Sequence, residues 1–367
     1  MQFREHGISM KQVDQMMKEA ITDEVFPGGV LLVAAADSVV FFEAYGYADI
    51  FAKHPIDKET VFDLASLTKP LATTLAVMQL VSQHKLRLDQ DLGSVLPLLY
   101  NSEKSRITLK QLLCHTSGLC DYRPYYESLD KLPPNRRKDA LREFLVSEPL
   151  INPPGAKVLY SDLGFMLLNW VVEQVAERRL DQFVKAEIYD RLGIEKLFFV
   201  DPDSEPRNVQ FAATERCPWR DTIIKGVVHD ENAYAVGGIE GHAGLFGTAK
   251  DVYRLLSVLL TDFYGQSESI LFEKKLMQTF FIRDGSSGRP LGFDAPSSTG
   301  ASCGQYFSKK SVGHLGFTGT SFWMDLDRGF IVILLTNRVH PSRDNVKIKA
   351  FRPQVHDMVM TLIGVHP

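Results

Sequence analysis

Cysteine is scarce in this sequence, and no apolar stretch is long enough to span a membrane. The four cysteines have no close CxxC spacing and are too few to cross-link a chain of 367 residues, so we expect reduced thiols. The first twenty residues also lack the apolar core of a secretory signal. Together these absences predict a cytoplasmic protein that does not associate with membranes.

A basic stripe is missing as well. The formal net charge is -4, and acidic and basic residues are interspersed along the chain. A protein that follows a phosphate backbone concentrates positive charge on one face, so we expect no nucleic-acid partner. Hydrophobic residues make up 45% and charged residues 23%, which is the balance of a folded globular protein.

Several catalytic and binding motifs are absent too. No GxSxG elbow occurs, which argues against an α/β-hydrolase. Residues 237–247 carry glycines around His242, but without a Walker lysine or GxGxxG spacing they predict a loop or strand edge near a cleft. His229 has no second histidine at ligand spacing, which favours a hydrogen-bonded loop over a metal site. We therefore expect neither cofactor nor metal.

The order of the expected elements predicts an α+β fold. Alternating apolar residues indicate one antiparallel hairpin near each end of the chain, formed by residues 30–36 with 39–45 and by residues 320–324 with 330–336. Helical patterns flank and separate the hairpins, at residues 9–25 (with Ser9 as the N-cap), 67–86, 108–115, 137–147, 162–177, 180–192 and 345–363. The two ends should therefore meet in one sheet that a helical insert interrupts.

Ser66 and Lys69 are the first candidates for chemistry. They lie in FDLASLTKP (residues 62–70), which leads into an apolar helical run. An offset of three residues at a helix start places the hydroxyl and the amine on one face. Apolar neighbours and the positive end of the helix should lower the pKa of the Lys69 amine, so that it can take the proton of a serine nucleophile.

The spacing alone is weak evidence, because two other serine–lysine pairs share it. Ser82 and Lys85 lie at a helix end in a polar stretch, and Ser128 and Lys131 precede a double proline. Neither setting offers an apolar helix start. Context therefore favours Ser66.

A second candidate element is Tyr160-Ser161-Asp162, on a loop before a helix. Two interpretations remain open. Ser161 or Asp162 can cap the helix while Tyr160 packs as an aromatic, or the Tyr160 phenol can relay a proton to a leaving group. Residues 115–118 (HTSG) are better explained as the turn that ends the preceding helix than as a histidine–serine catalytic pair.

A third element is GHLGFTGT (residues 313–320), which leads into the second hairpin. Glycines in an edge strand allow a substrate backbone to approach closely. The N–H of Phe317 can then join that of Ser66 in an oxyanion hole. A glycine bulge with a surface histidine is the alternative.

Together the three elements resemble a known family, the serine β-lactamases and penicillin-recognising peptidases, especially the branch of class C β-lactamases and related esterases. That family has Ser-x-x-Lys, Tyr-x-Asn and Lys-Thr-Gly in this order, and here residues 66–69, 160–162 and 314–316 correspond. Further similar stretches are LLCHTSGL (residues 112–119), YSDLGF (160–165) and GHAGLF (241–246).

The resemblance, over residues 15–363, implies a fold and a set of roles. The fold is an antiparallel sheet flanked by helices, with a discontinuous sheet domain (1–75 and 235–367), a mostly helical domain (76–234) and the active site in the cleft between them. The implied catalytic residues are Ser66, Lys69, Tyr160 and His314. Those expected at the substrate are Asp162, Gly316 and His242.

Two departures from the family pattern bear on the substrate. Asp162 replaces the asparagine, and a carboxylate near Lys69 would favour the charged amine unless Asp162 points away and caps its helix. His314 replaces the lysine that faces the substrate carboxylate, and a largely neutral imidazole is a weaker anchor. Esters or peptides with D-amino acids are therefore favoured over efficient β-lactam hydrolysis. Sliding Phe317-Thr318-Gly319 onto the third motif is possible, but the histidine register keeps a polar side chain facing the site.

Two functions from different classes follow. The first is acyl transfer from an ester, amide or peptide through an acyl-enzyme on Ser66. The second, motivated by Asp162 and His314, is a catalytically silent family member that acts as a binding or self-assembling scaffold. The sequence does not fix the oligomeric state.

Overall fold

A computed structural model describes residues 10–35, 38–202, 204–205, 207–266 and 271–365. Its largest sheet has six antiparallel strands in the order β3-β2-β1-β11-β10-β9. Their bounds are β1 Gly28–Ala35, β2 Ser38–Asp49, β3 His54–Pro55, β9 Val312–Leu315, β10 Ser321–Asp325 and β11 Phe330–Thr336. Because β1 pairs with β11, the two ends of the chain meet in one sheet, as predicted.

Both predicted hairpins are confirmed. β1 pairs antiparallel with β2, and β10 with β11. Of the short link expected between the first two strands, Asp37 lies outside the described residues. In the second hairpin the carboxylate of Asp325 accepts the N–H groups of Asp327 and Arg328 at 3.0 and 3.1 Å. An aspartate that bonds the backbone two and three residues ahead stabilises such a tight turn.

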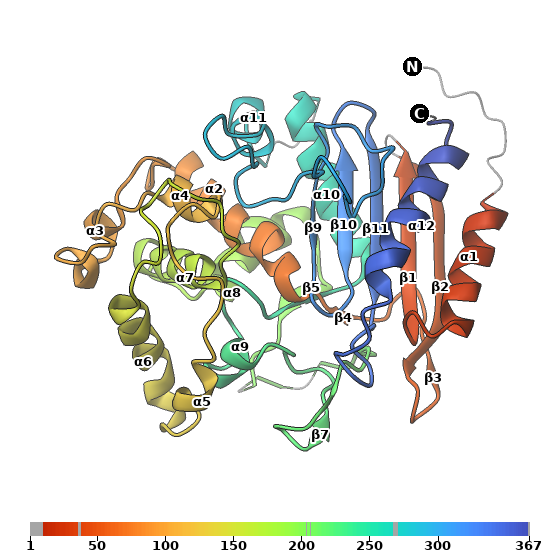
Figure 1. Cartoon of the computed structure of the whole chain (residues 1–367), viewed down its shortest axis with the longest axis horizontal. Coiled ribbons are helices and arrows are strands. Elements are labelled where there is room, and N and C mark those ends of the chain that lie inside the picture. The colour runs from red at the N-terminus through yellow and green to blue at the C-terminus, as the bar shows by residue number, and fades with distance from the viewer. Residues whose placement is uncertain (1–9, 36–37, 203, 206, 267–270, 366–367) are drawn as a thin grey trace.

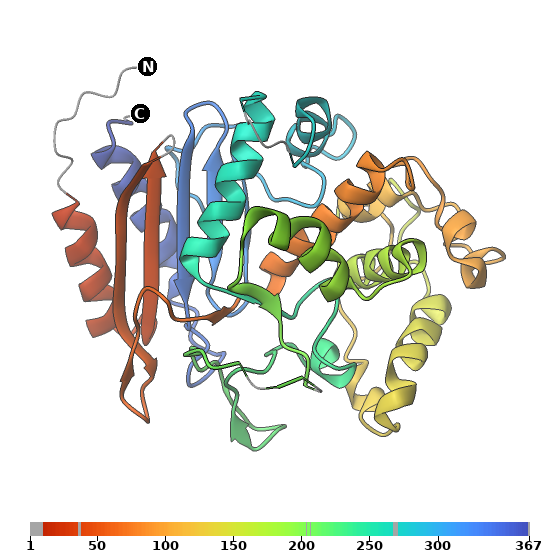
Figure 2. The same cartoon turned by 180° about the vertical axis from the view of Figure 1, so that it is seen from behind.

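Helices cover both faces of the large sheet. Its central strands therefore carry apolar residues on both faces. Leu31 and Val33 of β1 pack in one cluster with α1 (Lys11–Thr22) and α12 (Ile348–Leu362). Val30 and Leu32, which point the other way, pack with α10 (Ala249–Tyr264). Figure 1 shows α1 and α12 along one face, and Figure 2 shows α10 across the other.

The two terminal helices agree with the sequence patterns. α1 begins at Lys11, and Ser9, expected as its N-cap, lies outside the described residues. α12 occupies most of the predicted segment 345–363 and contains Pro353.

A mainly helical region lies beside the sheet (Figure 1). It contains α2 Thr74–Ser82, α3 Leu92–Val95, α4 Leu109–Leu113, α5 Tyr126–Leu129, α6 Pro134–Ser147, α7 Asp162–Ala176, α8 Leu180–Val184 and α9 Glu231–Ala235. The predicted helices at residues 108–115, 137–147 and 162–177 are confirmed as α4, α6 and α7. The segment predicted as one helix at 180–192 continues from α8 through a π-helical turn (Lys185–Tyr189) and a 3₁₀ turn (Asp190–Leu192).

The helical region shares one apolar core with the sheet, since a single cluster joins α2 and α7 to β1, β10 and β11. α11 (Lys274–Phe281) also packs there. A three-stranded sheet links the two parts, with β8 (Leu245–Gly247) between β4 (Phe62–Asp63) and β5 (Leu197–Phe199), and a small hairpin joins β6 (Arg216–Cys217) to β7 (Thr222–Ile223). The boundaries at 75/76 and 234/235 stay a prediction. None of the helices in the described ranges is both long and apolar enough to cross a membrane.

Candidate active site

Ser66 lies in a tight 3₁₀ turn, Ala65–Leu67, directly after β4. Ala65 has φ 48°, in the left-handed region that alanine rarely adopts. The buried carboxylate of Asp63 holds this turn, because it accepts the N–H of Ala65 at 2.8 Å and that of His229 at 2.6 Å. Strained backbone of this kind concentrates at functional sites. Asp63 is a supporting residue that the sequence patterns did not single out.

Lys69 is fully buried and opens the π-helical turn Lys69–Thr73 that continues into α2. Its Nζ lies 3.0 Å from Ser66 Oγ, 3.1 Å from the carbonyl oxygen of His242 and 2.7 Å from Asp162 Oδ1. An ammonium group has three hydrogens to donate. These three acceptors therefore suit a protonated lysine, and one of them is the hydroxyl of the predicted nucleophile.

The predicted low pKa of Lys69 is wrong for the protein without substrate. Burial alone lowers the pKa of this amine, but the charge of Asp162 and the nearby Tyr160 phenol outweigh burial and raise the pKa above its usual value. The alternative in which Asp162 points away is also wrong, because the carboxylate contacts Lys69 and Ser161 caps α7 by accepting the N–H of Gly164 at 3.2 Å. The other alternative, in which a carboxylate near Lys69 favours the charged amine, is confirmed.

Asp162→Asn is therefore expected to move the pH dependence of activity. Without the carboxylate the pKa of Lys69 falls, so the neutral amine becomes available at lower pH. An opposite charge at this distance shifts a pKa by about 1–3 units. The rising limb of kcat/KM against pH should move to lower pH by about that amount, and activity at pH 7 should be kept or increased.

The measurement is a pH–rate profile of both proteins with an uncharged ester. Asp181→Asn is a suitable control, since Asp181 forms an ion pair with Arg179 near the start of α8 and has no contact with Lys69. An unmoved limb in Asp162→Asn would show that this carboxylate does not set the protonation of Lys69. Loss of activity at every pH would make Asp162 a required proton carrier instead.

Tyr160 lies beside both residues, where the loop enters α7. The Lys69 Nζ is 4.9 Å from the centre of its ring. Burial raises the pKa of the phenol, and although Lys69 and a hydrogen bond to Ser66 act in the opposite direction, the pKa stays above its usual value. Tyr160 is therefore a protonated phenol that can donate. It is also 38% exposed, so part of its side chain is accessible to solvent.

His115 fixes the position of Tyr160. Its ring centre is 4.5 Å from that of Tyr160, and its Nδ1 accepts the N–H of Ser161 at 3.0 Å. The backbone of His115 has φ 58°, in the turn predicted after the helix that is now α4. Burial lowers the pKa of its imidazole well below the usual value, so the ring is neutral. His115 supports the site, although the sequence assigned it only to a turn.

The glycine-rich segment at 237–247 forms a loop that continues into β8, as predicted. Gly241 lies so close to α7 that a Cβ there would meet the carbonyl oxygen of Phe165 at 2.2 Å. His242 is 1% exposed, and its Nε2 lies 2.9 Å from Asp230 Oδ1. Its predicted contact with substrate is not supported by this position. Its carbonyl oxygen, which accepts from Lys69, is the part that reaches the site.

His314 lies on β9, the edge strand of the large sheet, with its ring centre 6.0 Å from that of Tyr160. Its Nδ1 lies 2.9 Å from the carbonyl oxygen of Leu315. Burial, with a further contribution from the charge of Lys69, lowers the pKa of this imidazole to about 3. His314 is therefore neutral at physiological pH, as predicted, and provides no cation for a substrate carboxylate.

The segment after β9 is joined directly to the Ser66 turn. Thr318 Oγ1 donates to the carbonyl of Asp63 at 2.7 Å, and Thr320 Oγ1 donates to that of Leu64 at 3.0 Å. Gly316 allows this approach, because a Cβ at this position would meet the carbonyl oxygen of Leu64 at 2.6 Å. Thr318 is bonded to the Ser66 turn, whereas the His314 ring lies 6.0 Å from that of Tyr160, and the histidine register stays a prediction.

The N–H groups of Ser66 and Phe317 are both available for an oxyanion. Among the described residues neither donates to a protein acceptor. Ser66 lies at the start of a helical turn, where backbone N–H groups have no partner within the turn. Phe317 is 49% exposed. Preorganised N–H donors of this kind stabilise the charge that develops on a carbonyl oxygen under attack.

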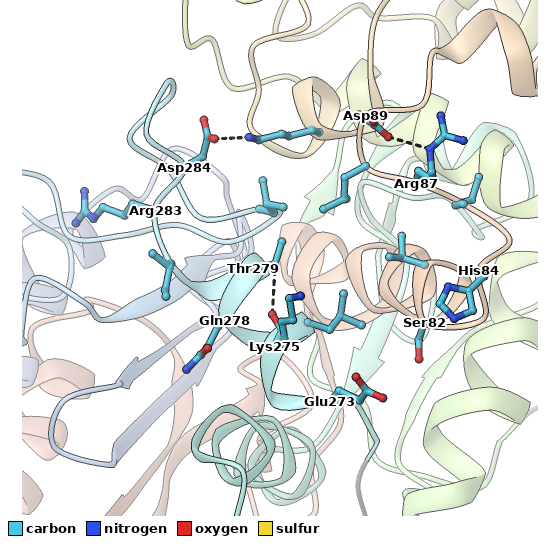
Figure 3. A pocket seen from close by; sticks show the side chains of 17 residues that line it. Ser82, His84, Arg87, Asp89, Glu273, Lys275, Gln278, Thr279, Arg283 and Asp284 are labelled. Carbon is cyan, nitrogen blue, oxygen red and sulfur yellow. Dashed lines mark hydrogen bonds and ion pairs between the residues drawn. The ribbon is translucent and has the colours of Figure 1, made fainter.

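A separate pocket of about 870 Å³ lies between the C-terminal end of α2 and α11. Figure 3 shows charged side chains among those that line it and marks the ion pair of Arg87 with Asp89 and that of Asp284, whose partner is Lys110. None of the residues predicted for catalysis lines this pocket. The candidate site is therefore the cluster of residues around Ser66, away from this pocket.

This chain is matched by a known family model. The model described as Beta-lactamase matches residues 13–356. The chain belongs to the beta-lactamase family. Members named among its relatives include the N-acetylmuramyl-L-alanine amidase of Bacillus subtilis (strain 168), 33% identical over 90% of this chain and 81% of the relative. A second is the putative D-alanyl-D-alanine carboxypeptidase of Salmonella agona (strain SL483), 30% identical over 89% of this chain and 82% of the relative.

The fold comparison agrees with the family. EstCE1, described as a hydrolase with promiscuous acyltransferase activity, aligns with a TM-score of 0.72 at 24% identity, covering 95% of this chain and 98% of the other. At that identity the likeness shows the fold alone, which confirms the predicted sheet with flanking and inserted helices. As a beta-lactamase family member, the chain is a serine hydrolase.

Proposed function

We propose that Ser66 is the nucleophile of this beta-lactamase family enzyme and that Lys69 and Tyr160 carry its proton. In the form with neutral Lys69, Ser66 Oγ attacks the substrate carbonyl and its proton passes to Lys69 Nζ. The N–H groups of Ser66 and Phe317 hold the resulting oxyanion. Tyr160 donates a proton to the leaving group as the carbonyl re-forms and the scissile bond breaks, and Lys69 restores the proton of Tyr160.

Hydrolysis of the acyl-enzyme reverses these roles. Water attacks the ester carbonyl, its proton passes to the Tyr160–Lys69 pair, and Ser66 Oγ leaves with a proton from the same pair. The observation that carries the proposal is the 3.0 Å contact between Lys69 Nζ and Ser66 Oγ at the end of a strained turn. A surface serine–lysine pair would have neither the burial nor the strain.

The proposed substrates are uncharged esters and amides or peptides with D-amino acids. His314 is neutral, so the edge strand offers a polar contact but no cation to a substrate carboxylate. The relatives named as an amidase and as a putative D-alanyl-D-alanine carboxypeptidase support amide substrates. Asp162 and His314 motivated the scaffold alternative, and the contact of Asp162 with Lys69 supports the catalytic proposal over it.

A three-substrate comparison tests this assignment. p-Nitrophenyl acetate and D-alanyl p-nitroanilide should be hydrolysed, with an acyl adduct detectable by intact mass, whereas nitrocefin, which carries a carboxylate, should be the poorest of the three. A charge-assisted hydrogen bond contributes about 1.5–3 kcal/mol, so His314→Lys should raise kcat/KM for nitrocefin about 10- to 150-fold.

The uncharged ester serves as the internal control for that variant. Its kcat/KM should change little in His314→Lys, because it has no carboxylate for the new cation. Equal changes for both substrates would show that His314 does not face the substrate carboxylate. Efficient nitrocefin turnover by the natural sequence would overturn the proposed preference.

A further inference from the structure

Two buried arginines lie behind the third motif, and the proposed mechanism does not use them. Arg338 follows β11 and Arg352 belongs to α12. Each is 6% exposed. Arginine is seldom buried to this extent without a carboxylate partner, yet neither forms an ion pair within the described part of the chain.

Both arginines donate to backbone carbonyls around Phe317. Arg338 binds the carbonyl oxygen of Phe317 with two donors, Nε at 2.9 Å and Nη2 at 2.5 Å, and its guanidinium lies 4.6 Å from the centre of the Phe317 ring. Arg352 Nη2 lies 3.4 Å from the carbonyl oxygen of Gly316 and 3.0 Å from that of Thr320. The two peptide units that flank Cα of Phe317 are therefore both held.

These contacts determine where the Phe317 N–H points. In a planar trans peptide the C=O and N–H bonds point in opposite directions. The carbonyl of Gly316 is directed at Arg352 and also accepts the N–H of Gly319 at 3.1 Å. The N–H of Phe317, in the same peptide, must then point away from that side, and Arg338 prevents the next peptide from rotating it.

The arginines also place positive charge behind the site. Burial lowers the pKa of Arg352 to about 10 and lowers that of Arg338, so Arg352 remains cationic at neutral pH. Glu215 is the carboxylate whose charge acts on Arg338, but it already contacts Arg343 at 2.5 Å and His229 at 3.1 Å. A low-dielectric interior transmits such charge more strongly than water does.

We propose that Arg338, assisted by Arg352, is a positioning residue. It orients the Phe317 N–H, and its positive charge helps the oxyanion hole to stabilise a negatively charged oxygen. The proposal rests on the proposed function of Ser66 and Phe317. It assigns a catalytic consequence to side chains that do not touch substrate. If the arginines only stabilised the fold, their loss would lower the stability of the protein without a specific effect on the chemical step.

The test compares Arg338→Met, Arg338→Lys and a matched control, Arg283→Met. Arg283 also donates to backbone carbonyls, those of Gly288, Pro296 and Lys309, but it lines the pocket of Figure 3 and makes none of the contacts described for Ser66 or Phe317. The measurements are kcat and KM for p-nitrophenyl acetate and the inhibition constant of phenylboronic acid, which forms a tetrahedral, negatively charged serine adduct. Thermal melting shows whether each variant is folded under the conditions of the assay.

Loss of one oxyanion donor costs about 10²–10³-fold in kcat, so a misdirected donor in Arg338→Met should lower kcat about 10- to 100-fold. KM should stay within about twofold, because the ground state makes little use of the oxyanion hole. Affinity for the boronic acid should fall in proportion to kcat, and Arg338→Lys should recover part of both. Arg283→Met should match the natural protein.

Parallel measurements on Ser66→Ala separate the two proposals. Activity that persists in Ser66→Ala overturns the proposed function itself. If Ser66→Ala is inactive while folded Arg338→Met keeps the natural kcat and boronic-acid affinity, the positioning role is wrong and the proposed function stands. If Arg338→Met does not fold, Arg338→Lys decides alone, since one ammonium cannot reproduce the two-donor contact and must lower kcat with KM unchanged.

Discussion

Ser66→Ala should reduce hydrolysis of p-nitrophenyl acetate by a factor on the order of 10⁵ or more, the scale seen when a nucleophilic serine is removed from a serine hydrolase. The loss should fall on kcat, because alanine leaves the neighbouring side chains and the backbone N–H groups in place. A fluorophosphonate probe should add its mass to the natural protein and not to the variant. Rates with each ester and intact mass after labelling provide the measurement.

The sequence supplies a matched control for this loss. Ser82 has the same three-residue offset from Lys85 but lies at the C-terminal end of α2, where it lines the separate pocket of Figure 3. Ser82→Ala should therefore keep both the labelling and the rate within about twofold, as surface substitutions usually do. Labelling that disappears in Ser82→Ala, or persists in Ser66→Ala, would assign the nucleophile elsewhere.

The fold could be predicted where the local pattern of apolar residues also indicates which strands pair. Alternating apolar residues predicted the hairpins, and their positions near the two ends of the chain predicted the shared sheet. α10 was missed, although Thr248 caps it by accepting the N–H of Asp251 at 3.2 Å and its apolar residues recur on one face. The three-stranded sheet was missed for a physical reason, since strands of two or three residues leave too short a pattern to recognise.

Only the residues of the candidate site that lie in local sequence motifs could be predicted. Ser66, Lys69, Tyr160 and His314 lie in recognisable segments, and the structure brings them together. The supporting residues depend on contacts distant in sequence: Asp63 binds the backbone of His229, and Arg338 binds that of Phe317. No local pattern marks a partner 166 residues away. For the same reason the pKa of Lys69 was predicted in the wrong direction, because its sign depends on whether Asp162 faces the amine.

Lys69→Met is expected to have the second largest effect, a fall in kcat/KM of about 10³-fold. General acid–base catalysis contributes about 10²–10⁴-fold, and methionine can neither accept the Ser66 proton nor return one to Tyr160. The rising limb of the pH–rate profile should also disappear, because the titrating amine is gone. Steady-state rates between pH 5 and pH 10 test both expectations, and a surviving limb would assign the proton acceptor to another group.

A fold control is essential for this variant, because Lys69→Met leaves the Asp162 carboxylate without its partner. Breaking a buried ion pair by removing one member costs about 3–5 kcal/mol, whereas replacing both members can be nearly neutral. The double variant Lys69→Met/Asp162→Asn should therefore melt closer to the natural protein than Lys69→Met does, yet remain as inactive. Recovery of activity together with stability would show that Lys69 holds the structure of the site, and that its amine takes no part in the chemistry.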